Sequence, residues 1–198
     1  MRFDTTTCLF DCYIVITEGS ATTGPQRAQF NAQYSIVVPA GSMIEVDTSY
    51  MPLVANQTYT GTIPMTWALT NHVYAPCDQP QNDFHSIIPV LSPASFYNNL
   101  ATGDTVKLFS LKVSPIPECA SDIRIFKNGI DPSSSAICFG GADFSCGFTI
   151  GGPSQDYTGN LPQIYPPKPS ATVEVGCGSG VHLDLTASTS ECQKPLTY

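Results

Sequence analysis

The chain has 198 residues, of which 8 are basic and 16 are acidic, and its formal net charge is −8 at pH 7. The hydrophobic share is 42% and the charged share only 12%, about half of the usual charged fraction. No stretch approaches the roughly 18 uninterrupted apolar residues of a membrane span, and no basic patch suits nucleic acid. Plentiful β-branched and aromatic residues argue against disorder. Composition therefore favours an acidic extracellular protein that is rich in strands.

Disulfides are the first structural feature that the sequence predicts. The chain has eight cysteines and three histidines, and because no two cysteines are spaced as CxxC, a zinc site is disfavoured. An even number of scattered cysteines indicates disulfides formed in an oxidising compartment. Cys8 and Cys12 lie in an extended run that puts their Cα atoms about 13 Å apart, so we expect no bond between them. The partners of Cys8, Cys12, Cys77 and Cys119 stay open.

Alternating hydrophobicity predicts the strands. The clearest one covers residues 29–38, where the even-numbered residues are apolar and the odd-numbered residues 29–35 are polar. Such a period of two places one face on a core and the other in water, and Pro39 ends the strand because it lacks an amide donor. The same alternation predicts strands over residues 63–69 and 144–150.

Residues 105–113 depart from simple alternation, because the apolar parity switches between Leu108 and Phe109. This switch indicates a β-bulge or a central strand that is covered on both sides. Short strands separated by Gly, Pro, Asn and Asp are typical of an antiparallel β-sandwich. Helix signals are almost absent, and residues 95–100 could form one helical turn at most. Further strands are expected over residues 13–17, 44–48, 84–91 and 122–126.

The composition changes after residue 150. Residues 162–169 contain four prolines, which favour an extended, semi-rigid linker. Alternation returns over residues 171–175 and 181–185. We therefore expect a sandwich domain over residues 1–160, a linker over 161–170 and the truncated start of a second small β-module over 171–198. The alternative is a C-terminal extension that packs back on the sandwich. Residues 1–4 lack a signal-peptide run, so we expect a fragment or a true N-terminus elsewhere.

Several segments resemble a known family. Residues 123–129 (IRIFKNG), 131–134 (DPSS), 140–144 (GGADF) and 147–152 (GFTIGG) are similar to a cohesin-like surface domain of large type IX-secreted proteins of Bacteroidota. Residues 99–113 resemble a late cohesin strand, and the whole resemblance covers roughly residues 3–160. It implies a jelly-roll-type β-sandwich. Cohesins proper bind dockerin modules, but no residue pattern here carries that specificity over.

The tail extends this resemblance. Residues 181–198, with LTAS and PLTY, resemble the start of PKD-like or gliding-adhesin-like repeats, which implies a long multidomain parent protein. The family segment is interrupted by Cys138 and Cys146, which flank a short glycine-bearing loop. Such a loop brings two Cα atoms within the roughly 4.4–6.8 Å that a disulfide needs, so we expect these two to pair. We also expect Cys177 to pair with Cys192, because both lie beyond the linker.

Two groupings could carry ligands or chemistry. Carboxylates at Asp131, Asp143 and Asp156 stand in or near a glycine-rich loop and could bind Ca²⁺, but no calcium-binding spacing is present, and solvated acids that cap turns are the favoured interpretation. A hydrolase site is disfavoured, since no Gly-x-Ser-x-Gly elbow is present. The residues weighed for it are Asp78, Asp83, His85 and Ser86.

Aromatic side chains give the last candidate site. Trp67 could stack on a sugar ring, yet it alternates in phase with Met65 and Leu69, which favours a core position. His72 is expected at a strand edge rather than as a ligand. Exposed tyrosines are a weaker glycan signal and suit subunit interfaces equally well. They are Tyr50, Tyr59, Tyr97, Tyr157 and Tyr165.

The sequence thus predicts an all-β, cohesin-like jelly-roll sandwich without a cofactor and without catalysis. We expect a structural and adhesive module of a secreted surface protein or appendage. Its expected partners are copies of itself and neighbouring modules, and a cell-surface glycan or protein is a further candidate. No nucleic acid or membrane insertion is expected. The alternative is a module that binds a glycan or a dockerin-type partner.

Overall fold

The protein is an all-β sandwich, as the sequence predicts. The computed structural model describes residues 1–4, 6–47, 66–90, 97–116, 122–151 and 159–160, with short stretches at 172–175, 181–184, 189–190 and 194–195.

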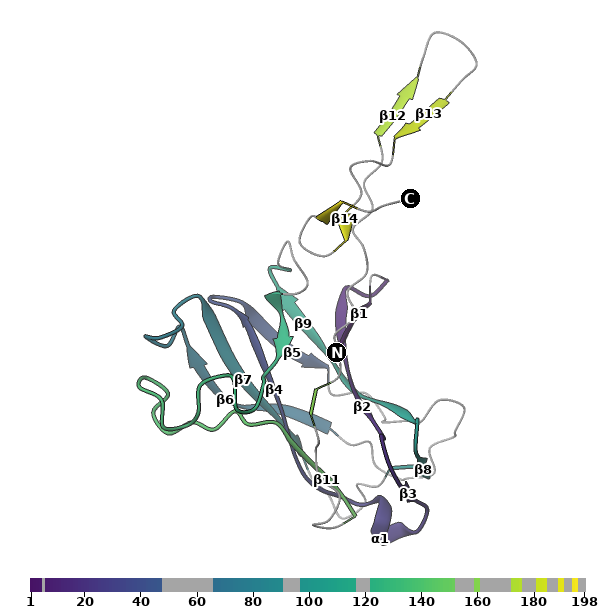
Figure 1. Ribbon diagram of the computed structural model, residues 1–198, viewed down its shortest axis with the longest axis vertical. Helices are drawn as coiled ribbons and strands as arrows, with labels where there is room; N and C mark the ends of the chain where they lie inside the picture. Colours follow the sequence, from purple (N-terminus) through teal and green to yellow (C-terminus); the bar gives the residue numbers. More distant parts are fainter. Residues whose placement is uncertain are drawn as a thin grey trace.

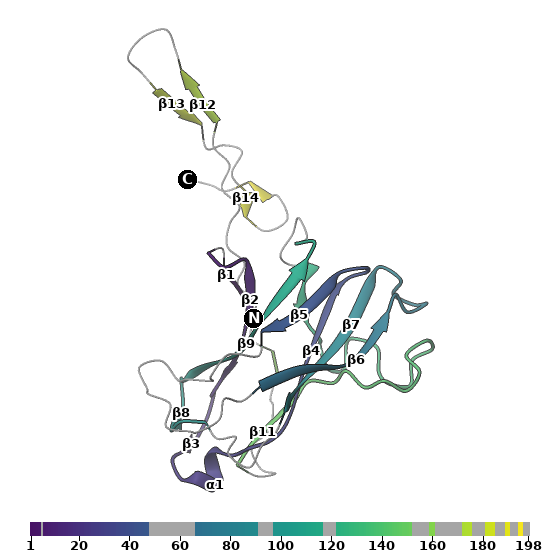
Figure 2. The ribbon, with the colours of Figure 1, turned by 180° about the vertical axis from the view of Figure 1, so that it is seen from behind.

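Two sheets form the sandwich. A four-stranded sheet has the order β1-β2-β9-β5, and a five-stranded sheet has the order β10-β4-β7-β6, in which β11 also pairs with β4. Figures 1 and 2 show both sheets from opposite sides. The four-stranded sheet comprises β1 (Arg2–Asp4), β2 (Leu9–Val15), β9 (Thr105–Ser114) and β5 (Met43–Asp47). The five-stranded sheet comprises β10 (Arg124–Ile125), β4 (Gln29–Pro39), β7 (Asn82–Val90), β6 (Thr66–Tyr74) and β11 (Gly147–Ile150).

The core lies between the two sheets. Phe109 of β9 meets the ring of Tyr34 from β4 at 5.3 Å and the ring of Trp67 from β6 at 5.0 Å between centroids. Trp67 is fully buried, which confirms its predicted place in the core. Aromatic contacts of this kind stabilise by about 0.5–1.5 kcal/mol each beyond the area that they bury.

The parity switch in residues 105–113 has the predicted cause. Strand β9 lies between β2 and β5, and its residues 108–111 are buried in succession. Its register against β2 shifts where Cys12 faces Phe109 and Tyr13 faces Lys107. The strand is therefore both central and bulged.

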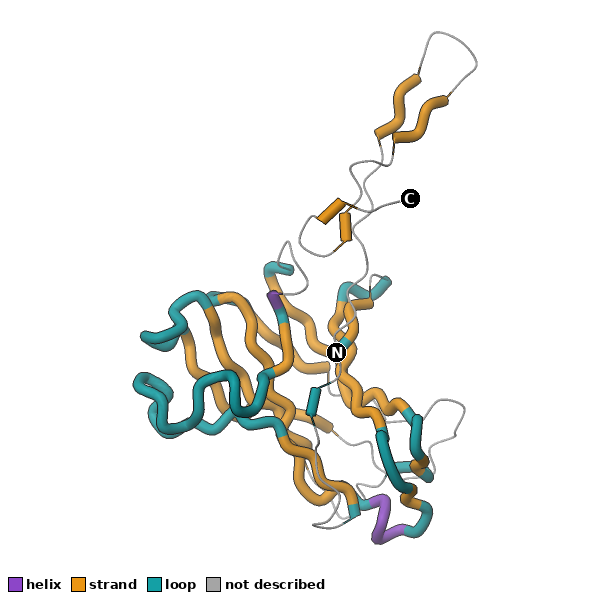
Figure 3. Tube along the Cα trace, viewed as in Figure 1, coloured by secondary structure: helices purple, strands orange, loops and turns teal. Residues whose placement is uncertain are grey.

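Strand β4 corrects one expectation. Its odd-numbered face was expected in water, yet Ser35 and Val37 are buried. The covering comes from residues 127–146, which leave the sheet between β10 and β11 and which we call the excursion. Both short strands pair with the same edge of β4, Arg124 opposite Val37 and Gly147 opposite Gln33. The excursion is thus an insertion within one interrupted strand, and Figure 3 shows it as irregular loop.

A helical turn escaped the sequence analysis. Helix α1 (Gly24–Arg27) has a proline in its first turn, and the Gln26 side chain accepts a hydrogen bond from the amide of Thr23. A Thr followed three residues later by Gln is a capping pattern, and it was the missed signal. A Cβ at Gly151 would clash with the backbone carbonyl of Gln26, so only glycine fits there.

The remaining strands form separate two-stranded ladders. Strand β3 pairs with β8, and the C-terminal stretches form β12–β13 and β14–β15. The strands predicted near residues 171–175 and 181–185 are present as β12 and β13. The proline linker lies outside the described residues, so the division at 160 and 170 stays a prediction. These strands are β3 (Ser20–Ala21), β8 (Leu100–Ala101), β12 (Thr172–Val175), β13 (Val181–Asp184), β14 (Thr189–Ser190) and β15 (Lys194–Pro195).

Candidate functional site

The excursion is closed at its base by a pair of hydrogen bonds. The Asn128 side-chain amide donates to the carbonyl of Cys146 at 2.7 Å, and the Cys146 amide donates to Asn128 Oδ1 at 2.8 Å. The Asn128 side chain therefore donates to and accepts from one backbone residue, as a neighbouring strand would, and joins the two ends of the excursion. Backbone groups that would otherwise be buried without partners are satisfied in this way.

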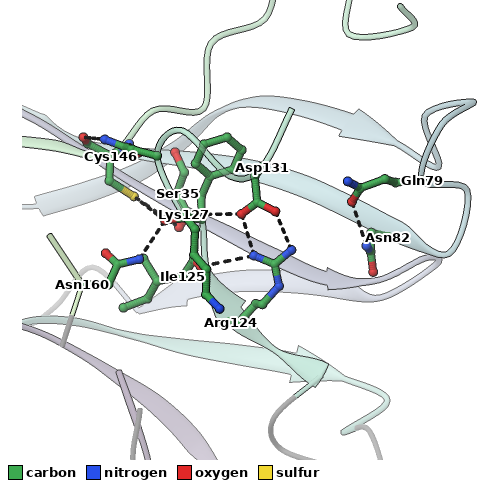
Figure 4. Close-up of polar contacts among 11 residues, drawn as sticks. Ser35, Gln79, Asn82, Arg124, Ile125, Lys127, Asp131, Cys146 and Asn160 are labelled. Carbon is green, nitrogen blue, oxygen red and sulfur yellow. Dashed lines mark hydrogen bonds and ion pairs between the residues drawn. The ribbon is translucent and has the colours of Figure 1, made fainter. Parts of the chain in front are cut away.

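An ion pair holds the first half of the excursion to the sheet (Figure 4). The guanidinium of Arg124 in β10 donates from both terminal nitrogens to the carboxylate of Asp131, at 2.6 and 2.7 Å. The backbone amide of Lys127 donates to the same carboxylate at 2.7 Å. The Asp131 side chain is only 6% exposed. A two-pronged pair with one buried partner is stronger than an ordinary surface ion pair.

Aromatic rings anchor the second half of the excursion. Phe139 and Phe144 are both buried, and their ring centroids lie 5.0 and 5.9 Å from that of Phe84 in β7. The ring centroid of Phe126, the residue just before the excursion, lies 6.2 Å from that of Phe84. The outer face of the five-stranded sheet thus has a small apolar core of its own.

A disulfide ties the excursion to a neighbouring turn. Cys138 bonds to Cys77 in the β6–β7 turn, with their Cα atoms 5.8 Å apart. The predicted pairing of Cys138 with Cys146 is therefore wrong. Residues 139–145 do not bring the two cysteines together. Phe139 and Phe144 pack against Phe84 of β7, whereas Cys138 lies at the β6–β7 turn. The predicted pairing of Cys177 with Cys192 lies outside the described residues.

Cys146 is a buried thiol instead. Its Sγ lies 3.7 Å from the Ser35 carbonyl oxygen and 3.6 Å from that of Phe126. Burial raises the pKa of Cys146 to about 11, and burial raises the pKa of the Cys12 thiol to about 12. Both thiols are protonated at neutral pH and are poor nucleophiles.

A groove opens beside the excursion where the five-stranded sheet divides. The β4–β7 ladder ends at Tyr34 opposite Ile87, and Pro89 follows in β7 without an amide donor to continue it. Gln33 reaches across to the excursion and donates to the carbonyl oxygens of Asp143 and Ser145 at 2.8 and 3.1 Å. The groove has a volume of about 420 Å³, within the range of ligand sites. Its lining comprises Asn31, Ala32, Gln33, Ile88, Pro89, Asp143, Ser145 and Gly147.

The residues weighed for hydrolysis do not form a triad. Both carboxylate oxygens of Asp83 accept backbone hydrogen bonds, from Gly41 at 2.7 Å and from Ala75 at 2.8 Å. His85 and Ser86 are adjacent in β7, so their side chains point to opposite faces. Asp83 is therefore a structural clamp between two turns.

The acids weighed for calcium have other roles. Asp131 is engaged by Arg124, which contradicts the expectation of a solvated acid there, whereas Asp143 accepts a hydrogen bond from the Ser145 amide at 2.8 Å and caps a turn as expected. Asp156 lies outside the described residues. Across the described part of the chain, no three His, Cys, Asp or Glu side chains gather as metal ligands would.

The aromatic candidates fare differently. Tyr97 is buried and is therefore not an exposed platform for a sugar ring. Its hydroxyl donates a hydrogen bond to the Gln29 side chain at 2.6 Å. His72 lies on β6, the last strand of its sheet, which confirms its predicted position at an edge. The other four tyrosines named above lie outside the described residues.

The comparisons with known proteins leave the family open. No protein-family model, no curated protein and no solved structure matches this chain. The cohesin-like resemblance therefore stays a prediction. Among the described residues, no helix has the length and hydropathy to cross a bilayer.

Proposed function

We propose that this chain is a non-catalytic structural and adhesive module of a large secreted bacterial surface protein or appendage. Its partners are copies of itself and neighbouring modules of the same polypeptide. One observation carries the proposal: the excursion is fastened by a disulfide, an ion pair and buried rings, yet it presents Ile130 and Ile137 to solvent. These side chains are 79% and 80% exposed.

Rigid display of apolar side chains is what a contact surface requires. Exposed isoleucine is unfavourable in water, and a loop that is already ordered loses little further conformational entropy when a partner covers it. The fastenings of the excursion, Arg124–Asp131 and Cys77–Cys138, hold the two isoleucines in place before any partner arrives.

The disulfide also supports an extracellular location. Disulfides persist in oxidising compartments and are rare in the cytosol. With only 8 lysines and arginines in 198 residues, the chain also offers few sites to trypsin-like proteases. Both properties suit a module that works outside the cell.

The test is adhesion between coated particles. Beads that carry the purified chain should cluster, and Ile130→Ser with Ile137→Ser should reduce clustering severalfold. The control is Ile116→Ser, at a residue that is 46% exposed and lies outside the excursion. Glycan and peptide substrate panels should show no turnover. Absence of clustering, or turnover that follows the protein through purification, would overturn the proposal.

The groove favours a second candidate, a glycan-binding module. Amide and carboxyl groups of Asn31, Gln33 and Asp143 line it beside the apolar surface of Ile88 and Pro89, a combination that suits sugar hydroxyls and ring faces. Titration of labelled chain with a soluble glycan panel tests it by NMR. Shifts confined to the groove, lost in Asn31→Ala, would favour this candidate, whereas shifts nowhere would exclude it for that panel.

A further inference from the structure

The four edges of the two sheets differ in how they are protected against pairing with another chain. Natural edge strands are usually kept short, charged, interrupted or proline-bearing. Strand β1 has 3 residues, β5 carries two acidic residues within 5, and the edge beside β4 is formed by two short strands that the excursion separates. Strand β6 has 9 residues, TWALTNHVY, with neither a charge nor a proline.

The middle of β6 is open to solvent. Residues 69–72 are exposed in succession, whereas the central strand β7 contains a run of five buried residues. Strand β6 is the last strand of its sheet, and among the residues that the structure describes no strand pairs with its outer edge.

The backbone of β6 indicates which groups face outward. The amide of His72 donates to the side-chain oxygen of Asn71 at 3.0 Å. Because backbone groups in an antiparallel strand point alternately to its two edges, the amides and carbonyls of His72 and Tyr74 both point outward. The Asn71 side chain thus accepts a hydrogen bond from the His72 amide, a donor that a partner strand could otherwise use.

The β6–β7 register shifts between Leu69 and Asn71, which confines the regular outward-facing ladder to residues 71–74. A strand that pairs with its own copy about a two-fold axis runs antiparallel to it. Outward groups must face outward groups, and within residues 71–74 both outward residues find a partner when His72 faces Tyr74 of the second copy and Val73 faces Val73. The rings of His72 and Tyr74, already 4.5 Å apart within one chain, then stack into a four-ring cluster across the axis.

We infer that β6 is the contact through which two copies of this chain associate, by antiparallel pairing centred on Val73. The inference rests on the proposed function, in which copies contact one another, and it names the edge that they use. Each chain carries a net charge of −8, while β6 carries none, so the strands themselves do not repel. Repulsion between the remaining charges is screened by salt, so pairing strengthens as ionic strength rises.

The experiment is sedimentation equilibrium of the full 198-residue chain and three variants, up to millimolar concentration. His72→Pro deletes one outward donor and the His72 ring, and removes no donor that faces β7. It should weaken dimerisation at least about tenfold, from the loss of two hydrogen bonds per dimer and of the ring contacts. Asn71→Ala frees the His72 amide and should tighten it. Met43→Lys, at a 71% exposed residue on the opposite edge β5, should change nothing. Circular dichroism and thermal unfolding check that each variant is folded.

A direct readout does not depend on substitution. In a mixed sample of labelled and unlabelled chains, an intermolecular NOE should join the Val73 α-protons, because facing residues that do not exchange hydrogen bonds bring their Cα atoms closest. Dimers that persist unchanged in His72→Pro, or that Met43→Lys abolishes, would overturn β6 as the contact and leave the proposed function standing. A chain that remains monomeric throughout would overturn the β6 contact. If its coated beads also fail to cluster, the proposed function falls with it.

Discussion

The five-stranded sheet is covered on its two faces by different means. On the inner face the four-stranded sheet supplies a regular layer, in which Phe109 packs between Tyr34 and Trp67. On the outer face the excursion supplies an irregular layer, held by the Cys77–Cys138 disulfide and by specific polar contacts. Each covering buries central residues of the sheet, such as Tyr34 on the inner face and Val37 on the outer face. A regular layer is thus stabilised by contact area, whereas an irregular one needs particular fastenings, each of which is a separate point of failure.

The largest effect should come from the core between the regular layer and the five-stranded sheet. Trp67→Ala removes the largest fully buried side chain and should lower the free energy of unfolding by about 4 kcal/mol. Denaturant unfolding followed by circular dichroism measures it, and Trp67→Phe should lose markedly less. If Trp67→Ala instead loosened only the excursion, the two coverings would not be independent.

Loss of the disulfide should be the next largest effect and should stay local. The bond closes a segment with a sequence separation of 61, so Cys138→Ser should destabilise by about 3 kcal/mol, and Cys77→Ser should match it. Hydrogen exchange should quicken in the excursion first, while β2 and β9 remain protected. Cys146→Ser is the control, because it removes a thiol and no cross-link. A loss as large in Cys146→Ser would contradict the assigned pairing.

The ion pair should contribute less than the disulfide. Asp131→Asn removes the charge that Arg124 and the Lys127 amide share, and should cost about 2 kcal/mol. Deuterium uptake at residues 127–131, compared with uptake at the β2–β9 ladder, measures the local part. Uniform uptake across both layers would show that the ion pair acts on the whole sandwich.

A further effect should depend on pH. Burial lowers the pKa of His85 to about 4, whereas an unfolded histidine titrates near 6.5. The unfolded state therefore binds more protons between these values, and stability falls as the pH drops through that window. Unfolding at pH 7 and near pH 4.5 should show a larger loss in the wild type than in His85→Gln. Identical pH profiles would mean that His85 takes up its proton without unfolding.

Much of the two packed sheets is predictable from the sequence. Alternation placed β4 within a residue of its observed bounds, because a strand with a buried face repeats every second residue. The expected bounds of β7 and β9 were also within two residues, although neither strand follows simple alternation. The core position of Trp67 followed from its phase. The parity switch at Leu108 and Phe109 also had its predicted cause.

The irregular layer was not predictable in the same way. The buried odd-numbered face of β4, with Ser35 and Val37, depends on a segment about a hundred residues later in the chain. The disulfide was mispaired because the spacing of Cys138 and Cys146 fits a bond, whereas the true partner is fixed by the tertiary position of the β6–β7 turn. Asn128 and Gln33, which fasten the base of the excursion, have no local sequence signal. Their partners are backbone atoms that only the fold brings near.

The interrupted strand beside β4, formed by β10 and β11, also affects the order in which the parts of the chain can fold. Gln33 is separated by 110 residues from Asp143, whose carbonyl it contacts, while β6 and β7 are joined by a short turn. The β6–β7 hairpin closes early because its loop is small, and pairings distant in sequence close late. One edge of β4 thus stays without its partner strand until residue 150 is available. A chain that is exported before folding meets this condition automatically, whereas one that folds from the ribosome would expose that edge for most of its synthesis.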